Sequence, residues 1–424
     1  MTHSSNDRVL IGFAECVPAP EVAWSLADAG FRVTAFSRRG AKPLLRRCRD
    51  VDIVSVEPPE TDVRTTQRDL ERAIAATGAS VFLPLDDQSV WLCSRVDGAA
   101  IARPNSEHVQ VALDKRLQIE HALAAGFRVA QTQIGTADEI GAHPSVDYPL
   151  ILRPANAIEE RSGRLVRHGP LACADDVELD AALQHLGDRI LIAQSLLRGT
   201  SEGLFGLATD SGIEAWSAHR RIRMVDPHGS GSSACVSTRV PDDLLEPAKR
   251  FIERVRWSGM FMFEALRDAD GTPWFIEFNG RAWGSMALAR RIGFEYPAWA
   301  ARAAIDPRAR VEPPPIREGV VCRHLGMDLL HAVAVLRGPK SRAVEWPSRW
   351  RTLRDVLTFR PNETWYNARR GCRIIFVEDA ARAFAELARR LVKRVRSRQG
   401  GAFLRGPGAA RATQHARAND SGKR

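Results

Sequence analysis

Apolar and polar positions alternate along the first part of the chain in a pattern that predicts short strands separated by amphipathic helices. Runs rich in β-branched residues occupy 8–14, 31–36, 52–57 and 79–87, and apolar positions with helical spacing fill 66–78. Strands that alternate with helices form parallel sheets, so we expect a small open parallel sheet here. The turn after the first run lacks the GxGxxG pattern, and a dinucleotide site is therefore not expected.

A second unit with a different pattern begins near Ala112. Helical spacing over 114–126 and 243–257 alternates with β-rich runs, and a hairpin closed at DADG is predicted over 258–280. A proline-rich stretch at 310–319 indicates a linker, with helical patterns beyond it. We therefore expect a multidomain protein that combines α/β and α+β units. Its predicted parts are a Rossmann-like parallel-sheet domain (1–111), an α+β domain (112–309), a helical C-terminal region (310–395) and a disordered basic tail (396–424).

The second strand of the predicted hairpin carries a row of polar residues. In a strand, alternate residues share a face, so Glu277, Asn279 and Arg281 are expected to project together if the strand extends that far. A turn at Asp270–Gly271 places Glu264 directly opposite Glu277. Because two opposed carboxylates repel, a positive group must lie between them. Two glutamates and an amide supply the hard oxygen ligands that suit Mg²⁺. A half-exposed strand with a polar surface row is the alternative.

Length and charge narrow the class of protein. A chain of 424 residues, 44% hydrophobic and 26% charged, is long enough for two or three globular domains. Residues 381–424 hold twelve Lys or Arg against two Asp or Glu, which equals the formal net charge of +10. Such a basic end is typical of a solvated, disordered tail. We do not expect nucleic acid as a partner, although weak attraction of the tail to an anionic surface stays open.

Cysteine spacing and the length of apolar runs bear on location. The seven cysteines lie far apart with no CxxC pair, which argues against a zinc ribbon or a disulfide framework and fits a reduced cytoplasm. No apolar run reaches about 18 residues, so no membrane span is expected. The N-terminus lacks a secretory pattern. A homodimer is left open by the sequence.

The hairpin residues resemble those of the ATP-grasp superfamily, whose last hairpin carries an acidic residue and then an E-x-N element. The form E-x-N-x-R with a serine soon after is similar to the biotin carboxylase and carbamoyl-phosphate synthase branch, and RAWGS is similar to a group of carboxylate–amine ligases. The similarity runs over about 112–305. It implies that the N-terminal sheet is the family's pre-ATP-grasp domain and that ATP is bound. It also implies that Glu264, Glu277 and Asn279 hold two Mg²⁺ ions, with Mn²⁺ as an alternative ion.

Two basic residues match the family's phosphate contacts. Lys115, in LDKR, stands where the family has a lysine that opens the ATP-grasp domain and contacts the ATP phosphates. Arg153, in YPLILRPA, stands where a lysine is usual, although carbamoyl-phosphate synthases also use arginine. A planar guanidinium contacts adenine differently from a compact ammonium group. The polar loop 156–164 matches the lid that the family folds over the phosphates, and a plain surface loop is the alternative.

The segment LIAQSLLRG resembles the family's hinge strand, which reads the adenine edge through backbone groups. The resemblance implies that Gln194 and Leu196 bind ATP, although Ser195 replaces the usual acidic residue. Glu202 stands where members often place a glutamate near the ribose. An ordinary acid on an edge strand is the alternative for Glu202.

The segment HRRIRMVDPHGSGSS resembles the stretch that precedes the hairpin in this family. Arg221 and Arg223 are expected on one strand face. With Arg281 they form the predicted catalytic set around the phosphates or a charged intermediate. We hypothesise that the loop 227–233 binds the substrate carboxylate or its acyl phosphate through backbone N–H groups. A solvated glycine- and serine-rich turn is the alternative.

These matches imply an ADP-forming, ATP-grasp carbon–nitrogen ligase. Such an enzyme activates a carboxylate as an acyl phosphate and transfers the acyl group to an amine, so a small-molecule carboxylate and an amine are the expected partners. A bicarbonate-activating carboxylase or a carbamoyl-phosphate-type enzyme is one alternative. Another is a catalytically silent nucleotide-binding regulatory protein, which Arg153 and Ser195 favour. The residues do not identify the acid or the amine.

Overall fold

The first sheet is parallel, as the alternation of strands and helices predicts. The computed structural model describes residues 7–96, 104–229, 231–339, 341–385 and 389. The strand order is β3-β2-β1-β4, and the pairings are parallel. The strands are β1 (Arg8–Gly12), β2 (Arg32–Arg38), β3 (Val51–Val56) and β4 (Val81–Pro84). The helices of this part are α1 (Ala19–Asp28), the short 3-10 helix η1 (Leu44–Arg47), α2 (Val63–Thr77) and α3 (Asp87–Cys93).

Helix α2 shows how local sequence sets these boundaries. At its start the Asp62 side chain accepts hydrogen bonds from the backbone N–H groups of Arg64 and Thr65. At its end Gly78 adopts the left-handed conformation (φ +63°) that a glycine takes up without strain. The aspartate before the helix and the glycine after it therefore set its ends at Val63 and Thr77, close to the predicted range 66–78.

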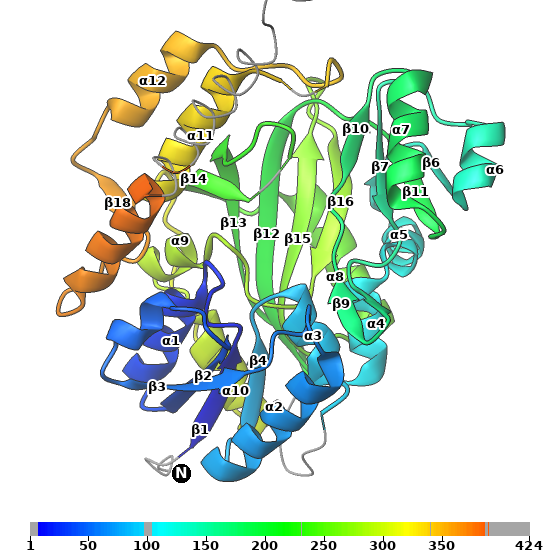
Figure 1. Cartoon of the computed structure of the whole chain (residues 1–424). Helices are drawn as coiled ribbons and strands as arrows, with labels where there is room; N and C mark the ends of the chain where they lie inside the picture. Colours follow the sequence, from blue (N-terminus) through cyan, green and yellow to red (C-terminus); the bar gives the residue numbers. More distant parts are fainter. Residues whose placement is uncertain (1–6, 97–103, 230, 340, 386–388, 390–424) are drawn as a thin grey trace, which may run out of the picture.

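An eight-stranded sheet forms the centre of the molecule (Figure 1). Its order is β18-β17-β14-β13-β12-β15-β16-β5, with antiparallel pairs from β17 to β16 and a parallel pair at each edge. One face packs on α5 (Lys115–Ala124) and α8 (Asp242–Val255) through a cluster of phenylalanine rings. The other face meets α9 (Met286–Arg291) and α10 (Tyr296–Ile305), which also contact the N-terminal unit. The strands are β5 (Arg128–Val129), β12 (Thr200–Thr209), β13 (Gly212–Met224), β14 (Ser232–Thr238), β15 (Gly259–Arg267), β16 (Pro273–Asn279), β17 (Val321–Arg323) and β18 (Glu363–Trp365).

A smaller antiparallel sheet stands beside the eight-stranded one (Figure 1). Its order is β10-β7-β11-β6, and helices α6 and α7 pack on it. The hairpin β8–β9 follows β7 and turns at Gly163 (φ +75°). The Gly163 carbonyl accepts a hydrogen bond from Val63 N–H (2.9 Å), and Leu165 N–H donates to the Pro59 carbonyl (2.8 Å). The predicted lid therefore lies against the N-terminal unit. The elements are α4 (Ser106–Leu113), β6 (Thr132–Gly135), α6 (Ala137–Ala142), β7 (Leu150–Pro154), β8 (Glu159–Arg161), β9 (Arg164–Val166), β10 (Leu171–Cys173), α7 (Asp176–Leu186) and β11 (Leu191–Ser195).

The chain beyond the proline-rich stretch adds strands as well as helices. The helical pattern there is found as α11 (Leu325–Arg337), and α12 (Arg349–Leu357) and a helix over 373–385 follow. Strands β17 and β18, which the sequence did not predict, extend the eight-stranded sheet. The predicted basic tail, 396–424, lies outside the described residues. None of the helices in the described part is long and apolar enough to cross a membrane.

Glu21 connects segments from both ends of the chain. It lies on α1 with 0% exposure, and its carboxylate accepts hydrogen bonds from Arg290 (2.8 Å) and Arg291 (2.7 Å). The backbone N–H of Asn367 donates to the same carboxylate (3.2 Å). A buried carboxylate requires such partners, because leaving it unpaired is strongly destabilising. The N-terminal unit is therefore completed by residues from much later in the sequence.

Glu378 makes a second contact between the C-terminal segment and the N-terminal unit. Its carboxylate lies 2.7 Å from Arg46 Nη2 and 2.7 Å from Arg47 Nε. The hydrogen bond from Arg47 lowers the pKa of the Glu378 carboxyl most. Partial burial opposes this effect and Arg382 and Arg46 add to it, so that the pKa is about 2. These contacts hold the last described helix against η1.

The pH dependence of stability tests this contact. Because the pKa of Glu378 is lowered in the folded state, its ion pairs stabilise the fold fully above pH 4.5, the ordinary pKa. This stabilisation is lost as the pH falls from there to about 2. Glu378→Gln should lower the free energy of unfolding near neutral pH by on the order of 1 kcal/mol, and this difference should shrink below about pH 4.5. Urea unfolding across this range, followed by circular dichroism, measures it. Asp52→Asn, at a carboxylate with 72% exposure, is the control. A difference for Glu378→Gln that does not change with pH contradicts the assignment.

Candidate functional site

Two glutamates face each other across β15 and β16. Glu264 and Glu277 are directly paired in the register of these antiparallel strands, as the position of the turn predicted. The chain reverses over 268–272, where Gly271 has φ +83°. Next to the pair the register shifts by one residue and leaves Ile276 as a β-bulge. The bulge preserves the pairing of the two carboxylates although the strands beyond it are offset.

Each of these carboxylates is neutralised by a basic side chain from another element. Lys115 Nζ lies 2.9 Å from Glu277 Oε1, and Arg221 Nη2 lies 2.7 Å from Glu264 Oε2. Arg221 belongs to β13 and reaches Glu264 across the intervening strand β12. Burial by itself raises the pKa of the Glu277 carboxyl. The nearby positive charges, Lys115 foremost, have the larger effect, so the pKa lies below its ordinary value. The positive charge that the opposed carboxylates require is thus supplied by the protein.

Gly203, on β12 beside this pair, has no side chain and so leaves room for the rings of His219 and Phe205. It is paired with His219 on one side and with Glu264 on the other, and a Cβ atom there would lie 2.8 Å from His219 Nε2 and from the Phe205 ring. His219 is 1% exposed, and neither ring nitrogen has a hydrogen-bond partner in the described part of the chain. Burial, with Arg221 adding to it, lowers the pKa of His219 well below its ordinary value. A neutral imidazole therefore borders the carboxylates.

Arg153 approaches the two carboxylates from the smaller sheet. It lies on β7 and donates from Nη2 to Gln194 Oε1 on β11 (2.6 Å) and to the Ile276 carbonyl at the bulge (3.4 Å). Its Nε is buried and has no partner among the described residues. Burial lowers the pKa of Arg153, and Glu277 and Glu264 oppose that effect. A cation of one sheet thus faces the anions of the other.

Arg281 enters the site from beyond the strand, because β16 ends at Asn279. Its Nε donates to Asp87 Oδ1 (2.6 Å) and its Nη1 to the Ala282 carbonyl (3.1 Å). Burial raises the pKa of the Asp87 carboxyl, but Arg281, and after it Arg167, outweigh burial and the pKa is lowered. The stretch PLDD (84–87) predicts that ligands bind at this place, although the sequence gives no individual role to Asp87. The available signal was its place directly after a buried strand, at the edge of a parallel sheet where ligands usually bind.

Several solved structures are similar to this chain in fold, although no family model and no curated protein matches it. PurK, an N5-carboxyaminoimidazole ribonucleotide synthetase solved with ADP, covers 84% of this chain and 98% of its own, with a TM-score of 0.58 and 14% identity. The L-amino acid ligase from Bacillus licheniformis covers 74% of this chain and 78% of its own (TM-score 0.57, 14% identity). The biotin carboxylase domain of the Hydrogenobacter thermophilus 2-oxoglutarate carboxylase, solved with MgADP and bicarbonate, covers 75% and 74% (TM-score 0.58, 16% identity).

The chain has the ATP-grasp fold. The expected fold class, an N-terminal parallel-sheet domain followed by an ATP-grasp fold in a multidomain α/β and α+β chain, is thereby confirmed. At these levels of identity the likeness concerns the fold, and the residues of the site have to be judged from their own geometry.

The paired glutamates fit the magnesium site that ATP-grasp resemblance implies. The carboxylates of Glu264 and Glu277 and the amide oxygen of Asn279 are hard donors, and magnesium commonly completes such a set with substrate phosphates. Asn279 is 5% exposed, and its amide has no hydrogen-bond partner among the described residues. Within the described ranges no three His, Cys, Asp or Glu side chains gather as a metal site. The donor set is thus one that suits an ion shared with a phosphate group.

Both predicted hinge residues, Gln194 and Leu196, form hydrogen bonds within the protein. Gln194 lies on β11, where it accepts from Arg153 and donates from Nε2 to Thr132 Oγ1 (2.9 Å). Leu196 follows the strand, and its backbone N–H donates to the Pro149 carbonyl (2.9 Å). The N–H that was expected to read the adenine edge therefore has a protein acceptor in this structure.

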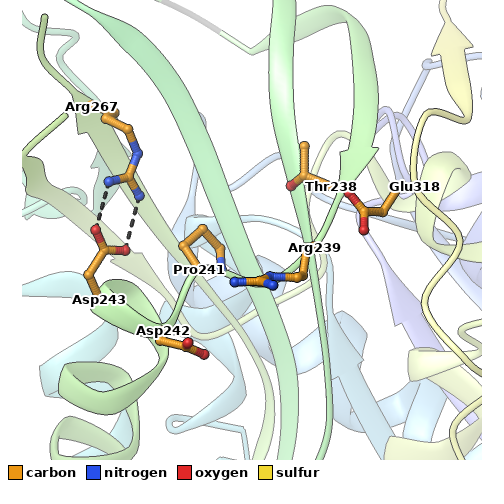
Figure 2. A pocket seen from close by; sticks show the side chains of 7 residues that line it. All are labelled: Thr238, Arg239, Pro241, Asp242, Asp243, Arg267 and Glu318. Atoms are coloured by element: carbon orange, nitrogen blue, oxygen red, sulfur yellow. Dashed lines mark hydrogen bonds and ion pairs between the residues drawn. The ribbon is translucent and has the colours of Figure 1, made fainter.

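Glu202 lies on the opposite face of the eight-stranded sheet from Glu264. Side chains alternate along β12, and it is Gly203 that is paired with Glu264. Glu202 binds Arg267 (Oε1 to Nε, 3.0 Å), which also binds Asp243 of α8. Figure 2 shows Arg267 and Asp243 beside a surface pocket of about 570 Å³, lined by none of the predicted site residues. This position does not support the expected ribose contact. It fits the alternative of an ordinary acid, although β12 is an inner strand and not the edge strand of that alternative.

Arg223 is separated from Arg221 by a β-bulge. The two arginines are paired with consecutive residues of β14, so they point to opposite faces, and the expectation of a shared face is wrong. Arg223 donates from Nε (2.9 Å) and Nη2 (2.8 Å) to Asp328, which is 0% exposed and also binds Arg323 (2.8 Å). Arg223 therefore belongs to an ion-pair network with α11 and does not join the group around Glu264.

The glycine- and serine-rich loop is described except for residue 230. His228 Nδ1 lies 2.8 Å from Asp226 Oδ1, and its ring lies 4.9 Å from that of Trp346. Gly229 has φ +115°, which a residue with a side chain rarely adopts. Binding of a carboxylate or acyl phosphate by this loop stays a prediction.

Gly203→Ala tests the close packing over β12. The new Cβ would meet His219 Nε2 and the Phe205 ring at 2.8 Å, and both rings are buried, so the strands or rings must shift. We expect the free energy of unfolding to fall by about 1–3 kcal/mol. Chemical denaturation measures the change. Gly169→Ala is the control, because a Cβ there meets nothing within 4 Å. Equal stabilities of the two variants contradict the packing described.

Proposed function

We propose that this protein is a magnesium-dependent, ADP-forming ligase that activates a carboxylate with ATP and transfers the acyl group to an amine. The observation that carries the proposal is the opposed pair Glu264 and Glu277, held by Arg221 and Lys115 and faced by Arg153 from the other sheet. Such a concentration of alternating charge between two sheets is suited to a polyphosphate and its counter-ions.

In this proposal each residue of the charged group has a role. Lys115 and Arg153 bind the phosphates of ATP. The magnesium is held by Glu264, Glu277 and Asn279, and when bound it neutralises charge at the phosphates. Gln194 orients Arg153 through their hydrogen bond. The hairpin β8–β9 covers the phosphates and excludes water, which would otherwise hydrolyse the acyl phosphate.

The proposed reaction has two steps. A carboxylate oxygen of the substrate attacks the γ-phosphorus of ATP, the bond from that phosphorus to the β–γ bridging oxygen breaks, and ADP leaves. The amine nitrogen then attacks the carbonyl carbon of the acyl phosphate. Inorganic phosphate departs with the electrons of the C–O bond, and the nitrogen loses a proton. No covalent intermediate with the protein is involved, and the basic residues act by charge stabilisation.

A second enzymatic candidate is activation of bicarbonate. The likeness to a biotin carboxylase domain solved with MgADP and bicarbonate favours it. The same first step applies, with bicarbonate as the carboxylate. A nucleotide-binding protein without turnover is a further candidate, favoured by Arg153, Ser195 and the engaged N–H of Leu196.

Substrate screening with release of ADP and phosphate as readout distinguishes these candidates. Pools of carboxylates and amines should give ADP only with Mg²⁺ present, and activity should need both pools. ADP formed with bicarbonate alone supports the carboxylase candidate. ATP binding without ADP formation in any pool supports the regulatory one.

Glu277→Gln tests the metal and phosphate assignment. The variant loses a carboxylate donor and leaves Lys115 without its partner, so ADP formation should fall by about 100-fold or more. Glu345→Gln, at a side chain with 75% exposure, is the matched control and should be as active as the wild type. Steady-state ADP formation at several Mg²⁺ concentrations measures both. Full activity of Glu277→Gln rules out the proposed site.

Removal of residues 386–424 separates this function from binding through the basic tail. The proposed site lies within the described residues up to Arg281, so a chain that ends at Ala385 should form ADP at the wild-type rate. The same assay, with and without added nucleic acid, measures this. Loss of activity on truncation, with folding retained by circular dichroism, favours a role for the tail.

A further inference from the structure

Asp87 lies where the N-terminal sheet is expected to bind ligands. In the order β3-β2-β1-β4 the chain moves to one side of β1 and then returns to the other, so the switch point falls between β1 and β4. Ligands of such sheets bind outside the carboxyl ends of the strands at this point. Asp87 follows β4 and is 7% exposed, whereas its neighbour Asp86 caps helix α3.

The contacts of Asp87 leave one nitrogen of Arg281 available. Asp87 Oδ1 accepts from Arg281 Nε (2.6 Å), and the Ala282 carbonyl accepts from Nη1 (3.1 Å). Among the described residues no acceptor is found for Nη2, and the Arg281 side chain is 17% exposed. A guanidinium fixed through two nitrogens presents the third in a set direction.

The Asp87 carboxylate also forms an ion pair with a residue next to the lid hairpin β8–β9. Arg167 directly follows β9, and its Nη2 lies 3.6 Å from Asp87 Oδ2. The lid hairpin is held at the N-terminal unit by the backbone bonds of Gly163 and Leu165 already described. In addition, Ala282 N–H donates to the Pro84 carbonyl at the end of β4 (3.4 Å). The hairpin strand, the lid and the N-terminal sheet therefore meet at Asp87.

We propose that Asp87 is a positioning residue that aims Arg281 Nη2 at the phosphoryl group being transferred, so that the N-terminal sheet completes the phosphate site. The inference rests on the proposed function, because the anion is the one that the ligase reaction handles. A buried ion pair by itself adds little to stability, since desolvation offsets much of the attraction. We therefore attribute the pairing of Asp87 with Arg281 to orienting the guanidinium and not to stabilising the fold.

The test uses inorganic phosphate as the probe, in the full-length protein saturated with MgADP. Isothermal titration calorimetry compares wild type, Asp87→Asn, Arg281→Ala and the double variant. Asn keeps the shape and one acceptor oxygen but not the charge. We expect Asp87→Asn and Arg281→Ala each to weaken phosphate binding by about tenfold, with MgADP binding unchanged. In the Arg281→Ala background Asp87→Asn should have no further effect, because it acts only through Arg281.

Asp52→Asn, an exposed carboxylate of the same sheet, is the charge-matched control and should bind phosphate like the wild type. Additive effects in the double variant, or wild-type phosphate binding by Asp87→Asn, overturn the positioning role and leave the proposed function standing. If the wild type binds MgADP but not phosphate, the positioning role is likewise overturned and the proposed function stands. A wild-type protein that fails to bind MgADP overturns the proposed function itself. Asp87→Glu, which restores the charge, should recover part of the phosphate affinity, and its failure to do so also counts against the inference.

Discussion

The repulsion between two carboxylates paired on neighbouring strands governs the charged groups around them. Glu264 and Glu277 are fixed opposite each other by backbone hydrogen bonds, so neither can move away along the sheet. The protein offsets their charge with Lys115 and Arg221, which come from a helix and from a strand on the far side of β12. A ligand that brings its own cations and anions has to exchange partners with these side chains. Under the proposed function, these are the ion pairs that the nucleotide and its metal replace.

Residues of three sheets contribute to one site. The eight-stranded sheet supplies the paired carboxylates, the smaller sheet supplies Arg153, and the N-terminal sheet supplies Asp87, which orients Arg281. The bulge at Ile276 is shared between two of these sheets, because its carbonyl accepts from Arg153. A site assembled in this way depends on how the units are packed, and not only on any one motif. The chain shares its fold with solved structures at 13–16% identity, whereas its charged contacts depend on the packing of its own units.

Local regularities made part of the fold and site predictable from sequence. The pairing of Glu264 with Glu277 follows from strand periodicity and the turn position, and both are encoded within a short segment. Arg223 was misplaced because a bulge, which has no clear signal in the sequence, reverses the face of a strand. The face on which Glu202 lies could not be predicted, because it depends on how β12 pairs with its neighbours across the sheet. The position of PLDD (84–87) at a ligand-binding edge follows from the local pattern, but the pairing of Asp87 with Arg281 was not predicted, because the two residues lie 194 positions apart and no local pattern indicates such a contact.

Glu21 acquires its partners late in the synthesis of the chain. Its carboxylate is buried against two arginines about 270 residues later and against the Asn367 backbone, which is 346 residues later. At a translation rate of about 5–20 residues per second, the delay before that last contact is on the order of tens of seconds. During this interval the N-terminal strands have left the ribosome, but the groups that neutralise Glu21 have not. The first unit to be synthesised is therefore among the last to be fully packed, because α1 gains these partners only after the later segments have been made.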